Sequence, residues 1–242
     1  MAELAEIAVC LIGDAAQKTI EKRGVFRLVL AGGSTPRTTY ELLASTEWRG
    51  RIDWAKAQIF WGDERMVPPD DVSSNYRMAQ EALLSKLDIN ESNIFRMRAE
   101  LEPAEAEQDY LNQLESAFGD EPVIFDLVLL GMGADGHTAS LFPGSPAVVE
   151  RRKPVSANYV AEMDSWRLTL TMPVLAAARQ LAFLVAGKEK AERVRQVLEE
   201  TETFAEELPS AALLNEAKGE VVWLLDRKAA SSLVGKSEGG QR

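Results

Sequence analysis

Two hydrophobic patterns alternate along the chain: apolar side chains at helical spacing, and short runs that are apolar throughout. Residues 3–22 show the first pattern and predict an amphipathic helix that ends at Gly24. The second pattern predicts strands, because a parallel strand that is buried on both faces is hydrophobic along its whole length.

The predicted strands and helices follow one another in turn. Strands are predicted at residues 25–31, 57–61, 123–130, 181–186 and 220–225, with weaker candidates at 153–158 and 167–171. Further helices are predicted at residues 73–87, 103–118, 173–179 and 188–200, one from Pro36 to Leu43 and one from about Arg227. This alternation implies one α/β domain, with a mostly parallel sheet covered by helices on both faces. Residues 1–235 are expected to form the domain and residues 236–242 a disordered tail.

Charge and hydropathy narrow the class of protein. The net charge of −11 argues against broad nucleic-acid binding, which requires a basic surface. A small anionic substrate would instead need a local cluster of arginine and lysine side chains. No apolar stretch approaches the roughly 20 residues of a membrane helix. The amino-terminal segment lacks the basic residues of a secretory signal, so a cytoplasmic protein without membrane association is expected.

The single cysteine, Cys10, excludes an intramolecular disulfide framework. It lies among Ile7, Val9 and Leu11 and is expected to be a buried, inert thiol. No cysteine and histidine positions have the spacing of a structural zinc site, so no metal is expected.

The only histidine, His137, follows the apolar run 123–130 within a glycine-rich turn. Histidine titrates near neutrality without help and is therefore a ready general base. Ligands of open α/β sheets bind outside the carboxyl ends of the strands. A histidine with satisfied hydrogen bonds and no function is the alternative, but the glycines, Asp135 and the strand end favour a site.

The same turn, Gly131-Met-Gly-Ala-Asp-Gly136, matches the glycine pattern of dinucleotide-binding folds. Pro143-Gly144 would cut short the helix that should hold the pyrophosphate, and no acid lies about 20 residues further on to hold a ribose. The sequence therefore gives little support to a nicotinamide cofactor, and no cofactor is expected.

Two other strand ends carry polar groups. Gly32-Gly-Ser-Thr-Pro36 could bind an anion with the backbone amides of a helix start, or could be an ordinary tight turn. It is not a P-loop, because the GK[ST] ending is absent. Asp63, Glu64 and Arg65 follow the strand at 57–61. They could form a surface ion-pair patch, or they could line a cleft in which Arg65 holds an anion or polarises a carbonyl.

These strand ends lie in segments that resemble the 6-phosphogluconolactonase family, in order along nearly the entire chain. The first segments are Leu30-Ala-Gly-Gly-Ser-Thr-Pro36 and Trp61-Gly-Asp-Glu-Arg-Met-Val-Pro68, with Ser74-Asn75-Tyr76. The most specific is Leu130-Gly-Met-Gly-Ala-Asp-Gly-His-Thr-Ala-Ser-Leu-Phe-Pro143. It is followed by Arg167-Leu-Thr-Leu-Thr-Met-Pro173, Gly187-Lys-Glu-Lys-Ala191 and Leu208-Pro209.

The resemblance implies a Rossmann-like sheet and hydrolysis of 6-phospho-D-glucono-1,5-lactone to 6-phosphogluconate in the oxidative pentose phosphate pathway. The implied partner is this small phosphorylated lactone, with the chain as a monomer or a weak homo-oligomer. The implied catalytic residues are His137, Asp135 and Arg65. The implied substrate-binding residues are Gly32, Gly33, Ser34, Thr35, Asp63, Arg167 and Lys190, with Arg167 and Lys190 on the phosphate.

The chemistry of such a reaction suits these residue types. A δ-lactone is an activated ester, so its hydrolysis requires neither a covalent nucleophile nor a metal. Water that loses a proton to neutral His137 can attack the carbonyl, with Asp135 orienting the imidazole. Backbone amides of residues 131–136, or Arg65, are available to stabilise the oxyanion.

Two alternatives remain. A related amino-sugar-phosphate isomerase or deaminase would be expected to carry a glutamate five residues after the histidine, where this chain has Phe142. It would also read Asp-Glu-Tyr where this chain has Asp63-Glu64-Arg65. A non-catalytic sugar-phosphate sensor would be expected to lose the base, whereas His137 is present.

Overall fold

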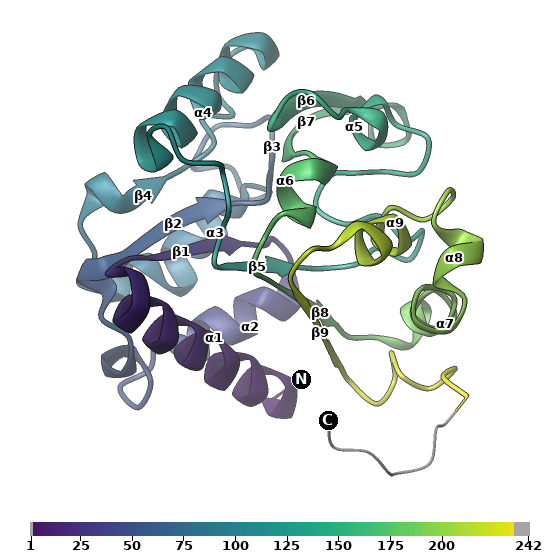
Figure 1. The fold of residues 1–242 in the computed structure, drawn as a ribbon, viewed down its shortest axis with the longest axis horizontal. Coiled ribbons are helices and arrows are strands. Elements are labelled where there is room, and N and C mark those ends of the chain that lie inside the picture. The colour runs from purple at the N-terminus through teal and green to yellow at the C-terminus, as the bar shows by residue number, and fades with distance from the viewer. Residues whose placement is uncertain (1, 235–242) are drawn as a thin grey trace.

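The computed structural model describes residues 2–234, and its centre is a six-stranded parallel sheet (Figure 1). The strand order is β4-β2-β1-β5-β8-β9. In that order the strands span Ile94–Phe95, Ala57–Trp61, Phe26–Leu30, Leu127–Leu130, Gln180–Val185 and Glu220–Leu225. Every neighbouring pair is parallel, which confirms the predicted α/β class with a mostly parallel sheet. The tail predicted at 236–242 lies outside the described residues.

Helices cover both faces of this sheet, as predicted. In Figure 1, α1 (Ala2–Arg23) and α2 (Ser34–Leu43) lie on one face, and α4 (Pro103–Phe118) and α6 (Met172–Ala176) lie on the other. The remaining helices are α3 (Asn75–Ala82), α5 (Pro146–Val149), α7 (Ala191–Glu199), α8 (Thr201–Phe204) and α9 (Pro209–Glu216). Burial on both sides explains why the central strands β1 and β5 are almost entirely apolar.

A second, antiparallel sheet of three strands packs beside the first, in the order β3-β7-β6. The weak strands predicted at 153–158 and 167–171 exist as β6 (Val155–Val160) and β7 (Ser165–Leu170). The third strand, β3 (Asp63–Arg65), was not predicted, because a polar triplet carries no strand pattern. Its register sets Arg65 opposite Arg167, which matters for the site.

Several predicted helix boundaries are wrong for local reasons. The helix predicted from Pro36 begins two residues earlier, at Ser34. The helix predicted at 73–87 ends at Ala82 and gives way to a short 3-10 turn. The helix predicted from about Arg227 does not form in the described part of the chain. Residues 227–232 form turns there, organised by the Asp226 carboxylate, which accepts hydrogen bonds from the amides of Gly187 and Ala229.

Two further expectations need correction: the burial of Cys10 and the start of one strand. Cys10 is exposed, because the buried stripe of α1 runs through Leu4, Ala8 and Ile12 and leaves the thiol on the outer side. The strand predicted at 123–130 begins only at Leu127. Among residues 2–234, no helix has both the length and the apolar character needed to cross a membrane.

Candidate active site

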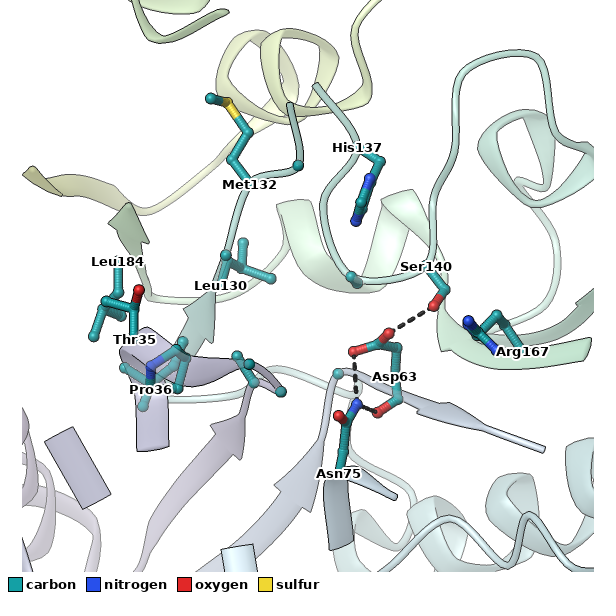
Figure 2. Close-up of a pocket in the computed structure, with 18 of the residues that line it drawn as sticks. Thr35, Pro36, Asp63, Asn75, Leu130, Met132, His137, Ser140, Arg167 and Leu184 are labelled. Carbon is teal, nitrogen blue, oxygen red and sulfur yellow. Dashed lines mark hydrogen bonds between the residues drawn. The ribbon is translucent and has the colours of Figure 1, made fainter. Parts of the chain in front are cut away.

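A pocket of about 310 Å³ opens at the carboxyl ends of β1, β2, β5 and β8 (Figure 2). The loops that follow these strands supply most of its lining, as expected for an open α/β sheet. The predicted site residues that line it are Gly32, Gly33, Ser34, Thr35, Asp63, Arg65, His137, Arg167 and Lys190. Asp135 does not line the pocket, but its carboxylate contacts Nδ1 of His137. The structure therefore brings all the predicted residues into one place.

His137 points its ring into the pocket (Figure 2), and the ring is fixed from two sides. Nδ1 lies 2.6 Å from Asp135 Oδ1, and the ring packs against Phe142 with 4.3 Å between centroids. A carboxylate only accepts hydrogen bonds, so in the neutral imidazole Nδ1 carries the proton and Nε2 keeps its lone pair. Nε2 is therefore the ring atom that can accept a proton from a group in the pocket.

Asp135 is held ionised by its surroundings. Partial burial opposes its ionisation, but the hydrogen bond from His137 and the interaction with that ring outweigh the burial and lower the pKa of Asp135. The same oxygen, Oδ1, also accepts a hydrogen bond from the His137 amide at 3.2 Å. An ionised carboxylate in this position stabilises the imidazolium that would form on proton transfer.

The turn that carries His137 is tightly packed at two glycines. Gly136 has a φ of +85°, and a Cβ there would lie 2.8 Å from Leu208, just before α9. The Ser210 amide donates to the Gly136 carbonyl at 3.1 Å, so the start of α9 holds the turn in place. A Cβ on Gly133 would lie 2.2 Å from His137 Nδ1 and 2.4 Å from Asp135 Oδ1. Gly133 therefore provides the space in which the imidazole and the carboxylate meet.

Gly133→Ala is expected to lower kcat by about tenfold to 10²-fold, because the added methyl must displace the ring from its partner. His137 is the only histidine, so its imidazole ¹⁵N signals in NMR report this displacement directly. Gly131→Ala is the matched control, since a Cβ there meets nothing within 4 Å. Unchanged His137 signals in the Gly133 variant would contradict the packing argument.

Asp63 and Glu64 have different roles, because neighbouring residues of a strand point to opposite sides. Glu64 is buried and turns away from the pocket toward the start of α3. Its carboxylate accepts hydrogen bonds from the amides of Asn75 and Tyr76, both at 2.7 Å, and from the Ser74 hydroxyl at 3.1 Å. Burial raises the pKa of Glu64, and these backbone hydrogen bonds oppose the increase. Glu64 therefore caps a helix, whereas Asp63 faces the pocket.

Glu64→Ala is expected to lower the free energy of unfolding by about 2 kcal/mol, because it leaves the first amides of α3 without acceptors. For a chain of this size, the loss corresponds to a fall in Tm of about 4–8 °C. Thermal unfolding followed by circular dichroism measures it. Asp63→Asn is the companion variant, and the division of roles fails if it lowers Tm as much as Glu64→Ala does.

The pocket concentrates positive charge in an otherwise acidic protein. Arg65 and Arg167 are opposite residues in the β3–β7 pair, and Lys190 lines the same pocket from the loop after β8. Burial, followed by the charge of Arg65, lowers the pKa of Arg167. Among the described residues, the two guanidinium groups bond only neutral partners. Arg65 donates to the Ser73 carbonyl. Arg167 donates to the Ser165 hydroxyl, the Trp166 carbonyl and the Met163 sulfur. This arrangement suits an external anion.

The start of α2 adds backbone donors to the same pocket. Gly33, the residue before the helix, has a φ of +103°, and the helix start has no side-chain cap. Ser34 and Thr35 are the first two helical residues, and the amide of each lacks an acceptor within the helix. The positive end of the helix dipole lies at the same point, so this segment can bind part of an anion.

Sequence reasoning missed two residues that line the pocket, Ser140 and Met163, and left the role of Asn75 open. Ser140 and Asn75 both bond Asp63, and Met163 contacts Arg167. Ser140 lies inside the same motif as His137, and Asn75 follows the Asp63 motif by a short interval. Within residues 2–234, no three His, Cys, Asp or Glu side chains gather as ligands for a metal ion.

Comparison with known proteins gives consistent matches over nearly the whole chain. The family model described as glucosamine-6-phosphate isomerases/6-phosphogluconolactonase matches residues 1–223. The chain is 39% identical over 236 residues to the 6-phosphogluconolactonase of Synechocystis, covering 95% of this chain and 94% of that protein. The solved 6-phosphogluconolactonase from Trypanosoma cruzi superposes with a TM-score of 0.85 at 32% identity, over 97% of this chain and 94% of that one. A monomeric glucosamine-6-phosphate deaminase superposes with a TM-score of 0.78 at 25% identity, over 96% of each chain.

Proposed function

This chain belongs to the family of glucosamine-6-phosphate isomerases and 6-phosphogluconolactonases, and we propose how its pocket hydrolyses a phosphorylated lactone. It is an enzyme with 6-phosphogluconolactonase activity, a carboxylic-ester hydrolase. The proposed reaction is hydrolysis of 6-phospho-D-glucono-1,5-lactone to 6-phospho-D-gluconate in the oxidative pentose phosphate pathway. Water adds to the lactone carbonyl carbon, and the bond from that carbon to the ring oxygen then breaks.

His137 is the proposed general base. Nε2 takes a proton from the attacking water, and Asp135 stabilises the resulting imidazolium through Nδ1. The imidazolium then returns the proton to the ring oxygen, which leaves as a hydroxyl group. The observation that carries this proposal is the His137–Asp135 pair, whose free nitrogen faces a pocket lined by three cationic side chains.

The substrate phosphate is proposed to bind Arg167 and Lys190 together with the loop of residues 32–35. These groups line one pocket, and long arginine and lysine side chains adapt their reach to a bound dianion. Their contribution is to orientation, because the phosphate is remote from the bond that breaks. The developing oxyanion would accept hydrogen bonds from amides of residues 131–136 or from Arg65.

The test is lactone hydrolysis measured against the spontaneous rate, with the phosphorylated lactone and with the same lactone lacking its phosphate. We expect acceleration of the first and little acceleration of the second. Ammonia release from glucosamine 6-phosphate without lactone turnover would support the deaminase alternative instead. At the position where a deaminase is expected to carry glutamate, Phe142 packs on the His137 ring and supplies no carboxylate.

A further inference from the structure

Asp63 is the one carboxylate among the described residues that line a pocket containing Arg65, Arg167 and Lys190. It lies across the pocket from His137, and Arg167 lies to one side (Figure 2). A carboxylate repels a phosphate, so Asp63 has no use in binding the dianion. It accepts hydrogen bonds from neutral donors, and the hydroxyl groups of a sugar chain are donors of that kind.

Two buried side chains hold the Asp63 carboxylate in its orientation. The Ser140 hydroxyl donates to Oδ2 at 2.6 Å, and Ser140 comes from the same loop as His137. The Asn75 amide group donates to the Asp63 carbonyl at 2.9 Å and approaches Oδ1 at 3.4 Å. Both residues are almost completely enclosed, with exposed fractions of 1% for Ser140 and 2% for Asn75. Burying the Ser140 hydroxyl and the Asn75 side-chain amide costs free energy unless each donates a hydrogen bond. Their bonds to Asp63 therefore hold it in one orientation.

Asn75 is itself fixed by its surroundings. Its backbone amide donates to Glu64 at 2.7 Å, which anchors the start of α3 to β3. Its side-chain oxygen lies so close to Gly32 that a Cβ on that glycine would be only 2.0 Å away. The chain of contacts therefore runs from the glycine loop through Asn75 to Asp63, and from Asp63 through Ser140 to the histidine loop.

The carboxylate retains acceptor capacity after these contacts. Two carboxylate oxygens offer about four acceptor positions, and Ser140 and Asn75 occupy one on each oxygen. We propose that Ser140 and Asn75 are positioning residues that hold Asp63 as an acceptor for substrate hydroxyl groups. The pocket then has a cationic part for phosphate and an acidic part for the polyhydroxyl chain. This inference rests on the proposed function, since the hydroxyl groups are those of a sugar acid or its lactone.

The experiment compares Ser140→Ala with Ser156→Ala, a serine on β6 outside the pocket. For each variant, kcat and KM for the phosphorylated lactone are measured. The dissociation constants of 6-phosphogluconate and of inorganic phosphate are measured by calorimetry. In Ser140→Ala we expect KM and the dissociation constant of 6-phosphogluconate to rise about tenfold, the loss typical of a hydrogen bond to a charged group. Inorganic phosphate contains no carbon-bound hydroxyl, so its affinity should stay unchanged, and Ser156→Ala should resemble the parent.

A double variant separates positioning from general damage. If Ser140 acts through Asp63, then Ser140→Ala should add nothing to Asp63→Asn, because the two changes remove the same interaction. Asn75→Asp, which replaces the second donor by an acceptor of similar shape, should weaken 6-phosphogluconate binding in the same selective way.

Equal loss of phosphate and 6-phosphogluconate affinity, additive effects in the double variant, or unchanged KM would each overturn the inference. A parent enzyme without lactone turnover would contradict the proposed function instead, while the binding measurements would still test the role of Ser140.

Discussion

Replacing His137 with asparagine is expected to lower kcat for the phosphorylated lactone by about 10²- to 10⁴-fold, the usual contribution of a general base. The asparagine amide can still donate to Asp135, so the loop keeps its main anchor, but it has no basic nitrogen in the position of Nε2. KM should change by less than about threefold, because the lost interaction forms only in the transition state.

The measurement must account for the spontaneous reaction. Initial rates with phosphorylated lactone are followed by proton release in weak buffer, and the rate without enzyme is subtracted. Thermal unfolding of the variant shows whether the fold is retained. Asp135→Asn is the companion change: it keeps the shape of the partner but lowers the stability of the imidazolium, so it should reduce kcat without raising KM. A His137→Asn enzyme with full kcat would refute the assignment of the base.

The elements that could be predicted from sequence are those whose ends are marked locally. The helix predicted at 103–118 has those bounds in the structure, because Pro103 suits a first turn and Gly119 follows its last residue. The strand at 220–225 was also predicted with its observed ends. In both segments the hydrophobic pattern, the flanking residues and the final packing all favour the same structure.

The small antiparallel sheet shows where local information ends. β3 is a polar triplet whose strand conformation exists only because β7 pairs with it from about 100 residues further along the chain. No pattern within residues 63–65 reports that pairing. The same pairing sets Arg65 beside Arg167, so the charge cluster depends on tertiary structure although each arginine was identified separately.

The location of the pocket could be predicted, because the carboxyl ends of parallel strands meet at one edge of the sheet. The glycine turns and His137 mark those ends, while Arg167 and Lys190 came from the resemblance to a family. The separate roles of Asp63 and Glu64 could not be predicted. Two adjacent acids differ only in the side of the strand that they face, and the helix that receives Glu64 starts eleven residues later.

Arg167→Ala is expected to lower kcat/KM for the phosphorylated lactone by about 10²- to 10³-fold, in line with the loss of one partner from a desolvated charge pair. Arg167 is half-buried, and burial together with Arg65 already disfavours its charge. A dianionic phosphate would relieve that repulsion, so its interaction with this guanidinium should be strong. Arg167→Lys keeps the charge but loses the planar fork, and it should recover only part of the activity.

A substrate without phosphate decides whether this loss comes from anion binding. The same lactone lacking its phosphate makes no ion pair in the parent enzyme, so Arg167→Ala should change its slow hydrolysis by less than about threefold. Arg152→Ala, an exposed arginine outside the pocket, serves as the matched control and should leave both substrates unaffected. If Arg167→Ala slows both lactones equally, the guanidinium acts on the reacting carbonyl. The phosphate must then be held by other groups that line the pocket, with Lys190 and the start of α2 as the candidates. If kcat/KM falls for the phosphorylated lactone alone, Arg167 binds the phosphate, because the phosphate is the only group that distinguishes the two substrates.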